Sequence, residues 1–210
     1  MIRVALVDDH ALIRRGLRDS LNEAGDIRVV GEAADYGELR QLLRDTEFDV
    51  LLLDINLPGR SGLDVLHSLA DHPVRIRTLI LTMYPEDQYA IRALKAGAMG
   101  YLNKSTDPGQ IVSAVRTVHA GRKFITPAIA EALAERLSVD ESHAAHERLS
   151  DREFQTLIRL ASGKRLSDIA TELNLSPKTV SVYRARVLEK LSVQTNAELT
   201  TYCLKNGLID

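Results

Sequence analysis

The sequence of 210 residues has no tryptophan, only 4% aromatic residues and a single cysteine, Cys203. So few rings argue against an aromatic cage or a platform for stacked bases. One cysteine cannot form an internal disulfide, which is typical of a protein in the reducing cytoplasm. No apolar run approaches the roughly 18 residues of a membrane helix, so we expect no membrane span.

The composition is that of an ordinary globular protein. Hydrophobic residues make up 45% of the chain and charged residues 27%, with a net charge of −2. These values exclude a disordered chain, a collagen and a coiled-coil rod. The length allows one large domain or two small ones. The charge balance alone does not indicate a nucleic-acid partner.

The first 120 residues alternate short apolar runs with segments whose apolar residues recur at helical spacing. Strands are predicted at residues 2–7, 27–34, 48–53, 76–81 and 98–102. Helices are predicted at residues 11–21, 36–44, 62–69, 86–96 and 107–119. This alternation predicts an α/β fold with a doubly wound five-stranded parallel sheet, as in flavodoxin-like proteins. The functional site of such a sheet lies beyond the carboxyl ends of its strands.

Polar residues follow four of these strands: Asp8 and Asp9, then Asp54, Thr82 and Lys104. Two carboxylates about 4 Å apart repel by about 4 kcal/mol at an effective dielectric of roughly 20. Mg²⁺ relieves such repulsion and binds carboxylate and phosphate oxygens. An aspartate beside a metal, a lysine and a hydroxyl is placed to attack phosphorus and become an acyl phosphate. Each residue alone would suit an ordinary loop, so the prediction depends on their joint placement.

Residues 121–147 break the alternation and are predicted to be a linker with a helical segment that opens at Pro127. A polar stretch with small residues follows that segment. It contains His143 and His146, which we expect to be solvated linker residues because no further metal ligands lie near them in the sequence.

Residues 148–210 have a helical pattern throughout, which predicts an all-α second domain. Ser150 and Glu153 form a capping-box pattern at its first helix. A short helix over 166–173, a tight turn and a longer helix from Pro177 to about residue 191 predict a helix-turn-helix. A fourth helix is predicted over 196–204.

The longer helix has one face suited to DNA. Val180, Val187 and Leu191 lie at helical spacing and are expected to face inward. Basic residues on the outer face would neutralise phosphates, and small side chains would reach base edges. On composition alone this could be an ordinary solvated face. The predicted DNA contacts are Lys178, Thr179, Ser181, Val182, Tyr183, Arg184, Arg186 and Lys190.

Residues 1–120 resemble the receiver domain of two-component response regulators. The resemblance is carried by VDDH (7–10), LLLDINLPGRSG (51–62), LTM (81–83) and AGAMGYLNK (96–104). It implies that a sensor histidine kinase phosphorylates Asp54. It also implies roles for further residues: Asp9, Asp54 and the backbone carbonyl of Asn56 as Mg²⁺ ligands, Asp8 acting through a bound water, Thr82 and Lys104 on the phosphoryl oxygens, and Tyr101 as a switch that turns inward when Thr82 moves. Asn103 is polar where the family often has an apolar residue.

Residues 148–210 resemble the LuxR-type DNA-binding domain of the NarL/FixJ class of regulators. The carrying motifs are LSDRE (149–153), LASGK (160–164), DIATELNLSPKTVSVYRARVLEKL (168–191) and NGLI (206–209). Ser181 stands where the family often has a lysine, and Tyr183 where it often has a histidine. The resemblance implies binding to double-stranded DNA as a homodimer formed through the last helix.

Two alternatives stay open. A phosphatase of the haloacid dehalogenase kind also uses Mg²⁺, aspartate and lysine, but places its nucleophile after the first strand in a D-x-D-x-T pattern, whereas Asp54 follows the third strand. The second alternative is a transcription regulator that works without phosphorylation. The favoured interpretation is a regulator that is not an enzyme.

Overall fold

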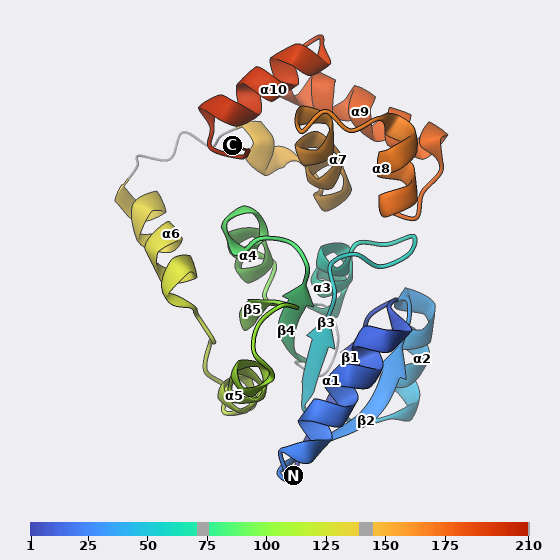
Figure 1. The fold of residues 1–210 in the computed structure, drawn as a ribbon, viewed down its shortest axis with the longest axis vertical. Helices are drawn as coiled ribbons and strands as arrows, with labels where there is room; N and C mark the ends of the chain where they lie inside the picture. Colours follow the sequence, from blue (N-terminus) through green and yellow to red (C-terminus); the bar gives the residue numbers. More distant parts are fainter. Residues whose placement is uncertain (71–75, 139–144, 210) are drawn as a thin grey trace. The chain divides into compact units, whose positions relative to one another are not determined.

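The computed structural model describes residues 1–70, 76–138 and 145–209 (Figure 1). The chain divides into two compact units, Met1–Ser138 and Val139–Asp210. The described strands of the first unit are β1 (Ile2–Val7), β2 (Ile27–Ala33), β3 (Val50–Leu53), β4 (Arg77–Thr82) and β5 (Gly100–Asn103). Its described helices are α1 (Ala11–Glu23), α2 (Tyr36–Asp45), α3 (Gly62–Ala70), α4 (Glu86–Lys95), α5 (Pro108–His119) and α6 (Pro127–Ser138).

The strands form one parallel sheet in the order β2-β1-β3-β4-β5, which confirms the predicted doubly wound α/β fold. Successive strand residues point to opposite faces. On one face Leu6, Leu52 and Leu81 belong to a core cluster that includes residues of α1 and α5. Helices α2, α3 and α4 cover the other face (Figure 1). The strand order reverses between β1 and β3, and open α/β sheets bind ligands at such a point.

The helical part of the predicted linker packs on the first unit. The Phe124 amide donates to the Met99 carbonyl at 2.8 Å, so the chain runs beside β5. The Thr126 hydroxyl then donates to Glu86 at the start of α4 at 2.5 Å, and accepts from the Ile129 amide at 3.3 Å. Ile129 itself is buried. Residues 122–138 therefore pack with the sheet domain, although the domain was predicted to end at residue 120.

The described part of the second unit is helical, which confirms the predicted all-α domain. A 3₁₀ helix, η1 (Ala145–Arg148), precedes α7 (Asp151–Ala161), α8 (Leu166–Glu172), α9 (Pro177–Leu191) and α10 (Asn196–Lys205). The capping box at Ser150 and Glu153 is present, and Ser176 caps α9 by accepting from the Thr179 amide. These caps satisfy amides that would lack partners at the helix starts, so the boundaries follow from the sequence.

The expectation for His146 is wrong, and His143 lies outside the described residues. His146 is only 7% exposed. Its Nδ1 lies 3.0 Å from the hydroxyl of Tyr202 on α10, and its amide donates to the same hydroxyl at 3.1 Å. The ring also lies against Phe154. The polar sequence around His146 therefore did not indicate a solvated side chain, because its hydrogen-bond partner Tyr202 comes from a helix distant in sequence.

Candidate functional site

Two neighbouring strands bring the acidic residues together. β1 and β3 pair in parallel with Val7 opposite Leu53, and the Asp54 amide donates to the Val7 carbonyl at 2.9 Å. Asp8 and Asp54 therefore leave the sheet side by side, and Asp9 follows Asp8. One side-chain ligand atom from each of four residues lies within 4.8 Å of the others: Asp8, Asp9, His10 and Asp54.

Gly62 shapes the loop that follows Asp54. The Gly62 amide donates to the Ile55 carbonyl at 2.8 Å, so α3 begins directly against the end of β3. A Cβ on Gly62 would lie 2.0 Å from the Asp54 carbonyl oxygen. Any other residue would force the backbone apart, because real Cβ atoms do not come so close. Asn56 lies inside this tight loop, and the role of its carbonyl as a metal ligand stays a prediction.

Lys104 follows β5, two strands away from β3 in the sheet, and its side chain extends to the acidic residues. β4 and β5 pair with Thr82 opposite Asn103, and the Lys104 amide donates to the Thr82 carbonyl at 2.8 Å. The Lys104 ammonium lies 2.6 Å from Asp8 Oδ2 and 2.7 Å from Asp54 Oδ2. The structure thus brings together the acidic residues and the lysine that the sequence singled out at four strand ends.

The carboxylates suit a divalent cation. Asp54 Oδ1 is buried and accepts no hydrogen bond from the described residues. A buried oxygen left in that state is costly, and a cation satisfies it. His10 Nδ1 lies 2.6 Å from Asp9 Oδ1, although its side chain is half exposed. His10 was not among the predicted site residues, but it stands directly after the acidic pair in the VDDH motif.

Burial and neighbouring charges set the protonation of the central pair. Burial raises the pKa of the Asp54 carboxyl above its usual value and the Asp8 carboxylate adds to this, while Lys104 and the Thr82 hydroxyl act in the opposite direction. Burial lowers the pKa of Lys104, but Asp54 and Asp8 outweigh it and leave that pKa raised. Lys104 therefore stays charged between two carboxylates, and positive charge in the pocket favours the nucleophilic form of Asp54.

Tyr101 is turned inward. The ring is fully buried, and its hydroxyl donates to the Tyr84 carbonyl at 2.9 Å. Burial raises the pKa of the Tyr101 hydroxyl, so it stays a hydrogen-bond donor. The ring of Tyr84 in turn stacks on Tyr89 of α4, with centroids 4.7 Å apart. Tyr101 thus contacts the loop that follows Thr82, and its role as a switch stays a prediction.

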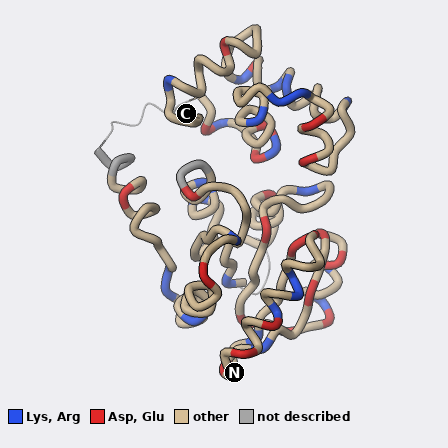
Figure 2. Tube along the Cα trace, in the orientation of Figure 1, with Lys and Arg blue, Asp and Glu red and all other residues tan. Residues whose placement is uncertain are grey.

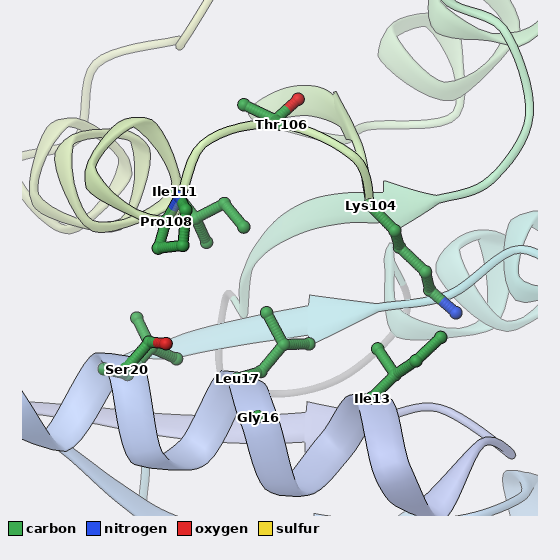
Figure 3. Close-up of a pocket in the computed structure, with 9 residues that line it drawn as sticks. Ile13, Gly16, Leu17, Ser20, Lys104, Thr106, Pro108 and Ile111 are labelled. Atoms are coloured by element: carbon green, nitrogen blue, oxygen red, sulfur yellow. The ribbon is translucent and has the colours of Figure 1, made fainter.

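A groove of about 260 Å³ opens between α1 and α5, beside Lys104. Figure 3 shows Ile13 and Leu17 of α1 facing Pro108 and Ile111 of α5 across it, with Lys104 at one end. The lining is mostly apolar. Leu12, one residue before Ile13, is 83% exposed. An apolar surface next to a reactive pocket is typical of a contact site for another protein.

The second unit contains the predicted helix-turn-helix. Asn174, in the turn after α8, has a φ of 53°, a left-handed conformation that asparagine tolerates. The Leu175 amide donates to the Ala170 carbonyl at 2.8 Å and closes the turn. Val180 and Val187 are buried, as predicted. Exposed residues of α9 include Lys178, Ser181, Val182, Ala185 and Arg186. Figure 2 shows charges of both signs intermixed along the described parts of both units, so the basic character of α9 is local.

Two of the predicted DNA contacts have partners inside the unit. Arg184 donates to Asn196 of α10 at 2.8 Å, and the Lys190 ammonium lies 2.6 Å from Glu153 of α7. These bonds hold α9 against its neighbours. Within residues 145–209, by contrast, Lys178 and Arg186 form no ion pair. The structure therefore divides the four basic residues of α9 into two that brace the helix and two that point to solvent.

The pair of Glu153 and Lys190 gives a stability prediction. Burial raises the pKa of Glu153, but Lys190 and the Ser150 backbone outweigh it and hold that pKa below its usual value. Its contribution is thus present above the usual pKa of a glutamate and is lost as the pH falls through the lowered pKa. We expect Lys190→Ala to cost roughly 0.5 kcal/mol, because Lys190 is partly exposed and screened, and Glu153→Ala on the order of 1 kcal/mol, because the cap is lost as well.

Amide hydrogen exchange of α7 and α9 in the full chain measures these losses. Glu189→Ala is the matched control, since Glu189 is an exposed acidic residue of α9. Equal protection in Lys190→Ala and Glu189→Ala at neutral pH would show that the ion pair does not brace the helix.

Known proteins match both units. A family model described as the response regulator receiver domain matches residues 4–116, and one described as bacterial regulatory proteins of the luxR family matches residues 147–203. The response regulator UvrY of Escherichia coli K12 is 36% identical over 99% of this chain and 96% of its own. The response regulator GacA of Pseudomonas aeruginosa is 36% identical over 100% of this chain and 99% of its own.

A solved structure matches the chain as well. RcsB from Salmonella enterica serovar Typhimurium, bound to a promoter in the presence of a phosphomimetic, is 25% identical with a TM-score of 0.64, over 96% of this chain and 97% of its own. Among the described residues, no helix is both long enough and apolar enough to span a membrane.

An acidic pocket at the edge of a doubly wound sheet, on a chain that also carries a helix-turn-helix, defines a response regulator that controls transcription. The chain belongs to the two-component response regulators of the NarL/FixJ class, with a receiver domain and a LuxR-type DNA-binding domain.

Proposed function

We propose that a sensor histidine kinase transfers a phosphoryl group to Asp54 and that this transfer controls DNA binding by the second domain. The observation that carries the proposal is the Lys104 ammonium, 2.7 Å from Asp54 Oδ2 and 2.6 Å from Asp8 Oδ2, at the edge of the sheet. An oxygen of Asp54 forms a bond to phosphorus while the bond from phosphorus to the donor's imidazole nitrogen breaks, and the nitrogen keeps the electron pair. Later hydrolysis restores Asp54 and releases phosphate.

The residues around Asp54 have separate tasks. Lys104 and the Thr82 hydroxyl bind the phosphoryl oxygens and offset their charge. Asp9, Asp54 and the Asn56 carbonyl would hold Mg²⁺, with Asp8 acting through a water. When bound, Mg²⁺ would supply positive charge that offsets the negative charge of the phosphoryl oxygens. The chain accepts one phosphoryl group rather than turning over a pool of substrate, so we classify it as a regulator and not an enzyme.

The magnesium requirement tests this proposal. Phosphoramidate, a small donor with a phosphorus–nitrogen bond, should label Asp54 in the presence of Mg²⁺ and not after chelation. The carboxylates of Asp8, Asp9 and Asp54 otherwise repel the incoming anion. Intact-protein mass spectrometry follows the labelling, and returning Mg²⁺ to the chelated sample should restore it. Equal labelling in excess chelator would contradict the metal site.

The groove between α1 and α5 is the surface we assign to the kinase. It begins beside Lys104, its lining from Ile13 to Ile111 is mostly apolar, and Leu12 next to it is exposed. A helical domain that carries a phosphohistidine could cover this groove and present its imidazole to Asp54. The proximity of groove and pocket supports this assignment.

Phosphorylation must change the balance between two states of the chain to regulate DNA binding. Moving such a balance from 1:99 to 99:1 requires about 5.5 kcal/mol of differential stabilisation. We propose two sources for this stabilisation. One is the set of charge-assisted bonds that Thr82 and Lys104 form with the phosphoryl group, with Tyr101 moving after Thr82. The other is a contact between the two chains of a dimer. A homodimer formed through α10 would place two copies of α9 about 34 Å apart, one turn of DNA. Solved structures of RcsB describe dimers bound to DNA.

A further inference from the structure

Two side chains of β5 bind the loop between β4 and α4. The Tyr101 hydroxyl donates to the Tyr84 carbonyl at 2.9 Å. The side-chain amide of Asn103 lies 3.3 Å from the carbonyl oxygens of both Met83 and Tyr84. Residues two apart on a strand face the same side, so Tyr101 and Asn103 act on this loop together.

Asn103 also binds the loop that follows β5. Its side-chain oxygen accepts from the Ser105 amide at 2.9 Å and from the Ser105 hydroxyl at 2.7 Å. One amide group therefore joins two loops, with its donor end on the loop after Thr82 and its acceptor end on the loop after Lys104. An apolar residue at this position could make neither set of bonds.

The position of Asn103 relates it directly to the phosphorylation pocket. Asn103 is the partner of Thr82 in the pairing of β4 with β5, and it immediately precedes Lys104. Met83, whose carbonyl it binds, immediately follows Thr82 and has a 62% exposed side chain. Asn103 therefore binds the first loop residue after Thr82, while Tyr101 binds the second, Tyr84.

We propose that Asn103 is a positioning residue that fixes the loop after Thr82 and so keeps the Thr82 hydroxyl directed at Asp54. The inference rests on the proposed phosphorylation of Asp54. Without the amide bonds, the backbone at Met83 and Tyr84 samples more conformations, and the Thr82 hydroxyl spends less time where it stabilises the incoming phosphoryl group. Donors held in place before reaction are worth more than donors that must be ordered during it.

The test is the rate constant for labelling of the full chain by phosphoramidate at saturating Mg²⁺. Asn103→Leu keeps the approximate shape and removes both sets of bonds. We expect a fall of roughly fivefold, about the effect of one neutral hydrogen bond. Asn22→Leu is the matched control, since the Asn22 side chain also binds a backbone amide, that of Val29, far from the pocket in the fold. An unchanged rate constant in Asn103→Leu would overturn the inference.

Three measurements distinguish a positioning role of Asn103 from a general contribution to the stability of the fold. Ser105→Ala removes only a bond at the acceptor end and should keep the original rate constant. The affinity for Mg²⁺, followed by NMR titration, should stay the same in Asn103→Leu, because the ligands come from β1 and β3. Asn103→Ser, whose shorter side chain cannot reach the loop, should reproduce the slower rate if the leucine variant is unstable. A parallel loss of Mg²⁺ affinity would overturn the inference.

A double-mutant cycle with Thr82→Ala gives the sharpest result. If Asn103 acts through the Thr82 hydroxyl, Asn103→Leu should have little further effect once that hydroxyl is gone. If the two substitutions lower the rate constant by factors that multiply, Asn103 acts independently of Thr82, and the positioning role is refuted. If the unchanged chain itself takes no label, the proposed phosphorylation fails, and the inference falls with it. That outcome is distinct from a labelled chain that is indifferent to Asn103.

Discussion

An Asp54→Asn protein is expected to take up no phosphoryl group from phosphoramidate or from a histidine kinase. The amide has nearly the same shape as the carboxylate, but its oxygen is a poor nucleophile and cannot form a stable acyl phosphate. The fold should persist, because Lys104 keeps its contact with Asp8 at 2.6 Å. Burial already raises the pKa of Asp54, so removing its charge does not leave the buried pocket less stable. Intact-protein mass spectrometry measures the loss.

Asp64→Asn is the matched control for this experiment. Asp64 lies in the first turn of α3, in the same domain, and is only partly buried. The same change of charge and shape there should leave labelling intact. Labelling of Asp54→Asn at the original level would place the phosphoacceptor at another residue.

The same variant separates the proposed function from its two alternatives. A regulator that works without phosphate would leave Asp54→Asn fully active in promoter assays. A phosphatase would release many equivalents of phosphate from small phosphate esters before the substitution and none after it. We expect neither result, since Asp54 follows β3 beside Asp8, and the receiver-domain model matches residues 4–116.

The fold and the pocket could be predicted because both depend on local patterns. Apolar runs mark strands that are covered on both faces, and parallel strands send their carboxyl ends to one edge. Four site residues lie at or just after the ends of these apolar runs: Asp8, Asp54, Thr82 and Lys104. Their proximity therefore follows from the topology of the sheet. The register of the strands then places Asp8 beside Asp54, because Val7 lies opposite Leu53 and the Asp54 amide donates to the Val7 carbonyl.

The remaining features depend on side chains that meet across large separations in sequence. The sequence marked Asn103 as unusual but did not predict its bonds to Met83 and Tyr84, because the path of a loop is not encoded in a hydrophobic period. His146 contacts Tyr202, which lies 56 positions later in the sequence. The packing of α6 on α4 likewise depends on Thr126 reaching Glu86. Composition could not distinguish these contacts from solvated loops.

Replacing Lys178 and Arg186 with alanine should weaken DNA binding more than any other change on α9. Both side chains are exposed on the face opposite Val180 and Val187. Each lost phosphate contact should make the dependence of log affinity on log salt shallower by about 1, and should weaken specific and non-specific DNA alike. Titrations of the full chain with duplex DNA at several salt concentrations measure both effects. A lost base contact would instead relax specificity at one position without changing the slope as much.

Two variants show whether the effect belongs to this face. Lys123→Ala removes the same charge from an exposed residue of the first unit and should leave the salt dependence unchanged. Arg184→Ala breaks the bond to Asn196, so its effect should include lower protection of α9 from hydrogen exchange, which Lys178→Ala should not produce. If the doubly substituted protein binds DNA with the original affinity and slope, α9 does not present this face to the duplex. Charge on the outer surface of a helix is evidence of DNA binding only when its removal changes the salt dependence, because solvated faces carry the same residues.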